Sequence, residues 1–281
     1  MVFDCSKHNC QSSLISFRYR PSCVVLRNND AWIAGGSGTS NSLSSSEFVN
    51  LKSGSKRGPD LPFDIWGHAA VKYREDSIYI IGGQLNKTLT NQTWIVNPRK
   101  EFEILEGPPM NVRRRGHSCG TFVKDGETVI IVAGGFDHTL TDLDSVEILI
   151  PSSGKGWQFG KILLASLRKY SLILWIFAGP KLPFKLAGSV MVTSPSNKGV
   201  ILIGGYNVEI EDYSNQIIEF RGTSMQWISL EQKLAYPRAD LVAIPMPTEF
   251  KSHKSRQSSR KRKARDLYQA GFSWSFWNIF W

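Results

Sequence analysis

Four short apolar runs, each ending in two glycines, constrain the fold of this chain more than any other feature. The runs are AWIAGG, IYIIGG, VIIVAGG and VILIGG, and their glycines are Gly35, Gly36, Gly82, Gly83, Gly134, Gly135, Gly204 and Gly205. Each run is short, apolar and stopped by glycine, which is typical of a buried strand followed by a sharp turn. Because the second glycines recur at intervals of 47, 52 and 70 residues, the sequence predicts a repeat protein.

The sequence around each glycine pair repeats as well. A first apolar stretch precedes each pair, at 23–26, 68–73, 117–123 and 187–193. Another stretch follows the loop after each pair, at 47–51, 93–97, 145–149 and 216–220. Three of the repeats show a fourth stretch, at 102–105, 157–159 and 227–230. Four strands in a unit of about 50 residues are typical of a β-propeller blade.

On these residues the chain resembles the kelch-repeat family, which includes kelch-like proteins and the central domain of galactose oxidase. Trp157 and Trp227 match the tryptophan that precedes the closing turn of a kelch repeat. The resemblance covers residues 20–245 and implies an all-β fold, a β-propeller of kelch blades. About four blades are complete, and partial blade strands are expected at both ends, at 2–4 and 13–17 and at 236–245. This organisation favours a partial chain.

One interval between glycine pairs is longer than the others. It falls from 70 to 52 residues when the apolar segment 161–178 is removed. We therefore divide the chain into a propeller over 1–250, interrupted by a probable insertion at 161–178, and a basic, then aromatic-rich, disordered tail over 251–281. The favoured hypothesis for 161–178 is a retained intron of 54 nucleotides, three for each residue. The alternatives are a helical insertion and a membrane helix, and Arg168 and Lys169 near its centre argue against the latter.

The net charge of +10 belongs to two segments rather than to the repeats. Eight Lys and Arg residues fall within 251–265, and three more, with no acidic residue, fall within 161–178. The remainder is close to neutral, so we expect no nucleic-acid binding by the propeller body and no membrane association. A cytoplasmic location is favoured. The basic run at 260–265 leaves nuclear import as an alternative.

No catalytic motif is present in the sequence. It has no GxSxG, HExxH or P-loop pattern, and its four cysteines have no zinc-ligand spacing. We therefore expect no enzyme activity, no cofactor and no metal. His68 and His117 each begin a first strand, which favours a structural role. A copper enzyme similar to galactose oxidase is a weaker alternative, because it needs a set of Tyr and His ligands that no motif here displays.

Binding of another protein is the favoured function. The loops after the double glycines and the loops before the first strands are expected to emerge on one face. They carry Trp66, Arg113, Arg114, Arg115, Phe136, His138, Tyr206 and Tyr213. Arginine and aromatic residues on a rigid face are typical of interaction hot spots, although they could also be ordinary exposed loop residues. The resemblance implies an adaptor such as those that present substrates to ubiquitin ligases or bind actin.

An extracellular kelch module is the alternative. Two glycosylation sequons, beginning at Asn86 and Asn91, fall in one loop after a double glycine. A glycan on either asparagine would place the protein in the secretory pathway.

Overall fold

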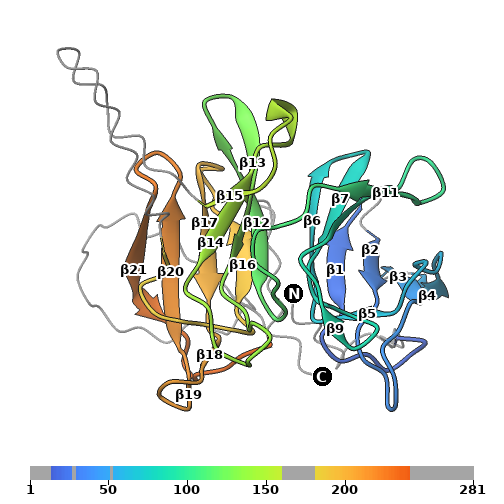
Figure 1. Cartoon of the computed structure of the whole chain (residues 1–281), viewed down its shortest axis with the longest axis horizontal. Coiled ribbons are helices and arrows are strands. Elements are labelled where there is room, and N and C mark those ends of the chain that lie inside the picture. The colour runs from blue at the N-terminus through green and yellow to red at the C-terminus, as the bar shows by residue number, and fades with distance from the viewer. Residues whose placement is uncertain (1–13, 27–29, 51–52, 160–180, 241–281) are drawn as a thin grey trace, which may run out of the picture.

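The chain forms an all-β protein, as expected from the sequence (Figure 1). The computed structural model describes residues 14–26, 30–50, 53–159 and 181–240. The predictions for 2–4, 161–178 and 251–281 lie outside these ranges, as does the part of the predicted strand at 236–245 that follows residue 240. Over the described part, the strands form six antiparallel sheets, and one short 3₁₀ turn spans Pro151–Ser153.

Four of the sheets have four strands each, arranged side by side in chain order; in the second and fourth sheets, two short strands of a separate small sheet lie between the second and third strands in the sequence. The first sheet contains β1 (Ser22–Val25), β2 (Ala31–Ala34), β3 (Ser46–Asn50) and β4 (Gly54–Arg57). The second contains β6 (Ala69–Arg74), β7 (Ser77–Ile81), β10 (Thr93–Asn97) and β11 (Glu103–Gly107). The third contains β12 (Ser118–Lys124), β13 (Glu127–Ala133), β14 (Val146–Leu149) and β15 (Gln158–Phe159). The fourth contains β16 (Val190–Thr193), β17 (Gly199–Ile203), β20 (Gln216–Arg221) and β21 (Gln226–Lys233).

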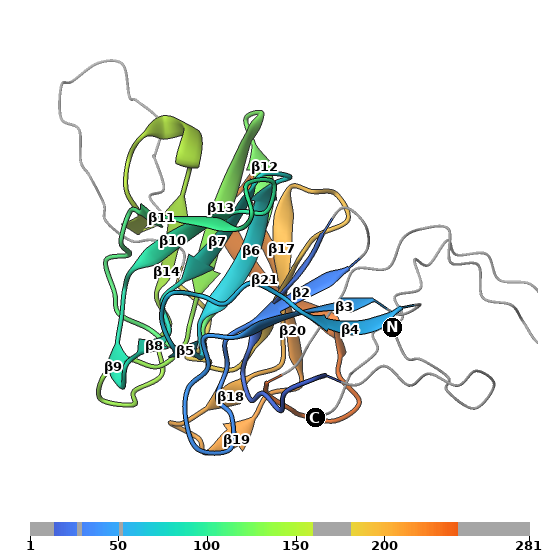
Figure 2. The ribbon, with the colours of Figure 1, turned by 90° about the vertical axis from the view of Figure 1, so that its right-hand side faces the viewer.

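Two small sheets lie at one end of the molecule (Figure 2). One contains β5 (Ile65–Trp66), β8 (Gln84–Leu85) and β9 (Thr88–Leu89). The other contains β18 (Tyr206–Asn207) and β19 (Asp212–Tyr213). Strands β8 and β9, like β18 and β19, arise from a loop that follows a double glycine, whereas β5 belongs to the segment that leads to the second large sheet.

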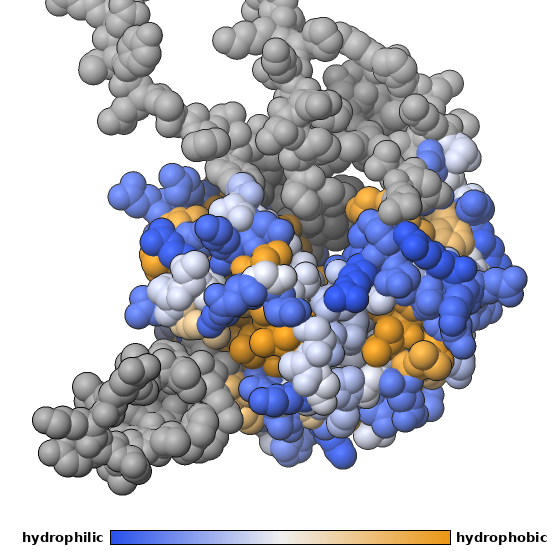
Figure 3. All heavy atoms as spheres, turned by 90° about the horizontal axis from the view of Figure 1, so that it is seen from above, coloured by the Kyte–Doolittle hydropathy of each residue, from blue (hydrophilic) through white to orange (hydrophobic). Residues whose placement is uncertain are grey.

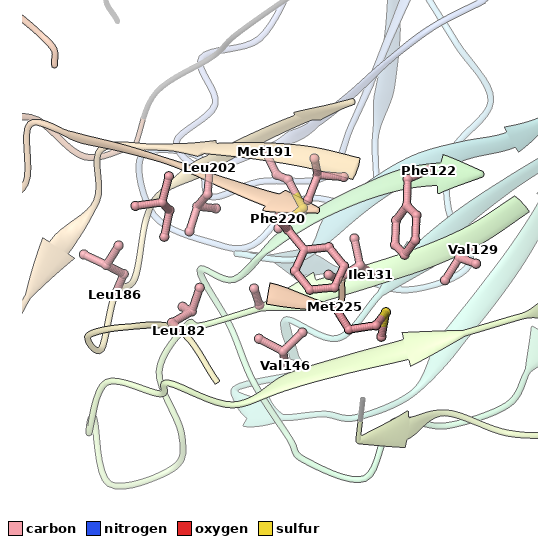
Figure 4. Close-up of a cluster of buried hydrophobic side chains, with 13 residues drawn as sticks. Phe122, Val129, Ile131, Val146, Leu182, Leu186, Met191, Leu202, Phe220 and Met225 are labelled. Carbon is pink, nitrogen blue, oxygen red and sulfur yellow. The ribbon is translucent and has the colours of Figure 1, made fainter. Parts of the chain in front are cut away.

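The four large sheets pack in chain order, with a hydrophobic cluster at each interface. Their first strands contact one another in succession, β1 with β6, β6 with β12, and β12 with β16. Between the third and fourth sheets, Phe122 and Ile131 point toward Phe220 and Met191 (Figure 4). Similar clusters join the first sheet to the second and the second to the third. Each fully buried side chain of this kind contributes about 1.5–3 kcal/mol relative to an exposed one, which makes these interfaces the main source of stability.

The double glycines occupy equivalent places, directly after the second strand of each large sheet, and all eight glycines have positive φ. The N–H of the second glycine donates to a carbonyl of the segment that leads to the next sheet. These four acceptors are Ile65, Arg114, Leu186 and Arg238. A Cβ added to Gly134 would lie 2.2 Å from the carbonyl oxygen of Leu186, so the close approach excludes side chains.

A chain of backbone hydrogen bonds links the sheets beside these glycines. In each of these bonds, the donor is the N–H two residues after Ile65, Arg114, Leu186 or Arg238. The acceptor is the carbonyl of the residue at the same position in the preceding unit. The bonds run from Gly67 to Arg20, Gly116 to Gly67, Gly188 to Gly116 and Asp240 to Gly188. We call Arg20, Gly67, Gly116, Gly188 and Asp240 the joint residues. Asp240 therefore stands where the joint of a fifth unit would lie.

Two expectations about strands are corrected. Residues 14–17, predicted as part of a leading strand, form no strand, because the Ile15 and Ser16 N–H groups donate to the Glu47 carboxylate instead. Strand β4 forms although no fourth strand was recognised in the first unit. It is a polar edge strand that pairs with β3 along its whole length.

The face opposite the small sheets is mainly hydrophilic, with separate hydrophobic patches (Figure 3). No helix long and apolar enough to cross a membrane is found among the residues that the structure describes.

Candidate binding face

The segments next to the joints form four matching backbone pairs on the side of the small sheets. In each pair, the residue just before a joint bridges to the residue just after a double glycine. The pairs are Tyr19 with Ser37, Trp66 with Gln84, Arg115 with Phe136, and Ala187 with Tyr206. Because every pair is held by backbone hydrogen bonds, the side chains project from a rigid base.

Arg115 lies between two of these pairs. Its guanidinium carbon is 4.6 Å from the centre of the Trp66 ring, and its Nη1 donates to Gln84 Oε1 at 2.7 Å. Burial lowers the pKa of Arg115, and the positive charge of Arg20 lowers it further. Arginine side chains are not deprotonated in proteins, so the guanidinium is a cation. The structure therefore fixes a cation against an aromatic face.

A second arginine stands beside it, at the first joint. Arg20 Nε lies 2.8 Å from Asp240 Oδ1, and Arg20 Nη2 donates to Asp240 Oδ2 at 2.9 Å. The hydroxyl of Tyr19 donates to the same Oδ2 at 3.0 Å. Burial is the main cause that raises the pKa of Tyr19, which keeps this hydroxyl a donor at neutral pH. These contacts join the first unit to residue 240, which is 221 positions away from Tyr19.

Further aromatic side chains lie on the same side of the molecule as the two arginines. The Arg20 guanidinium carbon is 5.9 Å from the Phe136 ring centre, and Tyr206 and Tyr213 form an edge-to-face pair at 5.0 Å. Tyr213 is 54% exposed, so part of this aromatic surface is open to solvent. We refer to this set as the arginine–aromatic cluster: Tyr19, Arg20, Trp66, Gln84, Arg115, Phe136, Tyr206, Tyr213 and Asp240.

Five of the eight predicted binding residues belong to this cluster, namely Trp66, Arg115, Phe136, Tyr206 and Tyr213. Sequence reasoning missed Tyr19, Arg20, Gln84 and Asp240. Residues 236–245 had been interpreted as a first strand, so the place of Asp240 beside the first unit was not anticipated.

Arg114 is a correction, because it is fully buried and cannot meet a partner. Its Nη2 donates to Glu147 Oε1 at 2.9 Å, and its Nη1 donates to the carbonyls of Gly134 and Ser145. The first sheet repeats this arrangement with Arg18 and Glu47, at 2.8 Å. Burial lowers the pKa of Arg114, and the neighbouring Glu147 carboxylate opposes that shift. The prediction failed because Arg113, Arg114 and Arg115 are adjacent in sequence but point in different directions.

Arg113 and His138 are exposed but lie apart from the contacts of the cluster. Arg113 lines a shallow hollow of about 190 Å³ with residues of the β8–β9 hairpin and the loop after it. His138 sits in a tight loop in which Asp137 Oδ1 accepts hydrogen bonds from the N–H groups of Thr139 and Thr141.

The two sequons differ in accessibility. Asn86 is exposed at the tip of the β8–β9 hairpin, with φ of 46°. Asn91 is partly buried, and its Nδ2 donates to the carbonyl of Met110 at 2.7 Å. Thr93, the third residue of that second sequon, is buried as well. A glycan on Asn91 would have to fit beside the hydrogen bond that its Nδ2 makes to Met110, whereas Asn86 is exposed.

Within the described ranges, no group of three or more His, Cys, Asp or Glu side chains is placed to hold a metal ion. Comparison with known proteins returns no match, either to a protein-family model or to a curated protein.

Proposed function

We propose that this chain is a binding scaffold of the kelch β-propeller type that recognises another protein and carries out no catalysis. In this proposal the four large sheets are the blades, and the double glycines are the turns at which each blade meets the next. Four meandering sheets of four strands, packed in chain order around a chain of joints, support it.

One observation carries the functional part of the proposal. The arginine–aromatic cluster presents two cations and several aromatic rings on loops that the joints hold rigid. Rigid aromatic and arginine side chains lose little conformational entropy on binding, which is why they dominate interaction hot spots. Loops can also vary in sequence without disturbing the packing between sheets.

The test is photo-crosslinking in cells that express the chain. A photoreactive amino acid replaces Tyr213 in the cluster or, as the matched control, Arg99, which is exposed in the β10–β11 turn at the far end of its sheet. We expect specific partner adducts from position 213 and none from position 99. Adducts found only at position 99, or at neither position, would contradict the proposed binding face.

The yield of these adducts should also depend on the side chains of the arginine–aromatic cluster. Trp66→Ala removes the ring against which Arg115 is held, so we expect the yield of adducts at position 213 to fall about tenfold or more. Thermal melting of the variant is the control for folding.

A further inference from the structure

Asp240 shows how the arginine–aromatic cluster holds a carboxylate. Its two oxygens meet Arg20 and the Tyr19 hydroxyl, at distances between 2.8 and 3.0 Å. The Asp240 side chain is 30% exposed, so the contact lies at the edge of the surface and not in the core. The cluster thus already binds one carboxylate, supplied by the chain itself.

Arg115 has no such partner. Its hydrogen bond is to the neutral amide of Gln84, and its other contact is the Trp66 ring. Among the ion pairs of the described residues, none involves Arg115, and the nearby charge that acts on it most is the cation Arg20. Within the arginine–aromatic cluster, the two guanidinium groups and the one carboxylate leave one unbalanced positive charge.

We propose that Arg115 anchors an Asp or Glu side chain of a partner peptide, with the neighbouring apolar side chains of that peptide resting on Trp66 and Phe136. This inference rests on the proposed function, since it names the chemistry of the partner. A carboxylate is planar and carries one negative charge, which matches both the guanidinium fork and the single unbalanced charge. A phosphate, with nearly two charges, would be repelled more strongly by Asp240.

The experiment selects ligands from a phage-displayed library of random 12-residue peptides. The wild-type chain, Arg115→Gln and the matched control Arg113→Gln are used as baits. Arg113 is an exposed arginine only two residues away, but it lines the separate hollow. The best peptide is then synthesised with its acidic residue intact, changed to the amide, or replaced by phosphoserine, and binding is measured by fluorescence anisotropy.

We expect wild type and Arg113→Gln to select peptides rich in Asp or Glu next to apolar residues. Arg115→Gln should weaken binding of the selected peptide about tenfold or more, and the amide peptide should show the same loss. Asp240→Asn should tighten binding of the acidic peptide several-fold, because it removes a neighbouring negative charge. Circular dichroism and thermal melting check that each variant is folded.

Three results would overturn the inference. They are selected peptides without acidic residues, acidic peptides whose affinity is unchanged by Arg115→Gln, and tighter binding of the phosphoserine peptide. If the selected peptides in any of these cases still lose their binding in Trp66→Ala, the proposed binding face is supported and only the proposal of an acidic partner is refuted. If no peptide is enriched, or if Trp66→Ala has no effect on binding, both proposals fail.

Discussion

The first and third large sheets solve one packing problem with charge, and the second and fourth solve it with apolar side chains. Two side chains meet at this place, beside the double glycine. One belongs to the residue two before the joint, and the other belongs to the third strand of the same sheet. The first and third sheets place Arg18 with Glu47 and Arg114 with Glu147 there. The equivalent side chains in the second and fourth sheets are Ile65 with Trp94 and Leu186 with Ile218.

The buried ion pairs also hold the preceding loop in place, which the apolar pairs cannot do. The Glu147 carboxylate also accepts hydrogen bonds from the N–H groups of Asn111 and Val112, and Glu47 does the same for Ile15 and Ser16. The ion pairs therefore tie the incoming loop to the sheet, whereas isoleucine and leucine only fill the space. Buried ion pairs seldom stabilise more than well-packed apolar groups, so their value here lies in fixing the loop that leads to Tyr19 and Arg115.

Breaking one ion pair should have the largest effect. In Arg114→Leu, the Glu147 carboxylate stays buried without its counter-charge, and we expect a loss of about 3–5 kcal/mol in the free energy of unfolding. Urea unfolding followed by tryptophan fluorescence measures it. A loss below about 1 kcal/mol would show that the N–H donors alone satisfy Glu147.

The fourth sheet supplies the control for this variant. The double change Arg114→Leu with Glu147→Ile gives the third sheet the side chains found at 186 and 218. It should be less destabilised than Arg114→Leu alone, because no buried charge remains, although the N–H groups of Asn111 and Val112 lose their acceptor. A double variant less stable than the single one would contradict the equivalence of the sheets.

A neighbouring position extends the comparison to pH. The residue after the joint is His68 in the second sheet and His117 in the third, but Ser189 in the fourth. Burial lowers the pKa of both histidines from 6.5 to about 3, and for His117 the charges of Arg114 and His68 add to the effect. The folded state thus keeps them neutral, while the unfolded state takes up protons below pH 6.5. Stability is complete above pH 6.5 and is lost as the pH falls toward 3.

At pH 5, each histidine should cost about 2 kcal/mol of stability relative to pH 7.5. In His117→Asn, the drop in unfolding free energy between these two pH values should be smaller than in the wild type by that amount. Comparing the two drops cancels any cost of the substitution itself. Equal drops would show that His117 is not buried in its neutral form.

The repeat itself was visible in the sequence because strands packed on both faces need apolar residues, and their turns need glycine. That is why the second strands before Gly36, Gly83, Gly135 and Gly205 coincide with observed strands. Strand β4 escaped because its sequence, GSKR, has no apolar side chain, and an edge strand needs none. The prediction of a strand at 14–17 was wrong for the opposite reason. It relied on apolar residues, but Ile15 and Phe17 are exposed and do not pack in a sheet.

The candidate site was only half predictable. Trp66, Arg115 and Phe136 follow or precede recognisable repeat features, so their face could be inferred. The pairing of Arg20 with Asp240 depends on how the first unit meets residue 240, and no local pattern encodes that distance. The burial of Arg114 was hidden as well, because it depends on Glu147, which is 33 residues further along the chain.

The smallest effect should come from an exposed ion pair in the same sheet as Arg18 and Glu47. Arg57 Nη2 lies 2.8 Å from Asp60 Oδ2, the same distance as in the buried pair, but these side chains are 69% and 46% exposed. Because water already solvates both charges, we expect Arg57→Ala to change the unfolding free energy by no more than about 0.5 kcal/mol. Urea unfolding at low and high salt provides the measurement, since any contribution should vanish with screening. A salt-independent loss above 1 kcal/mol would mean that distance, and not burial, sets the strength of ion pairs in this protein.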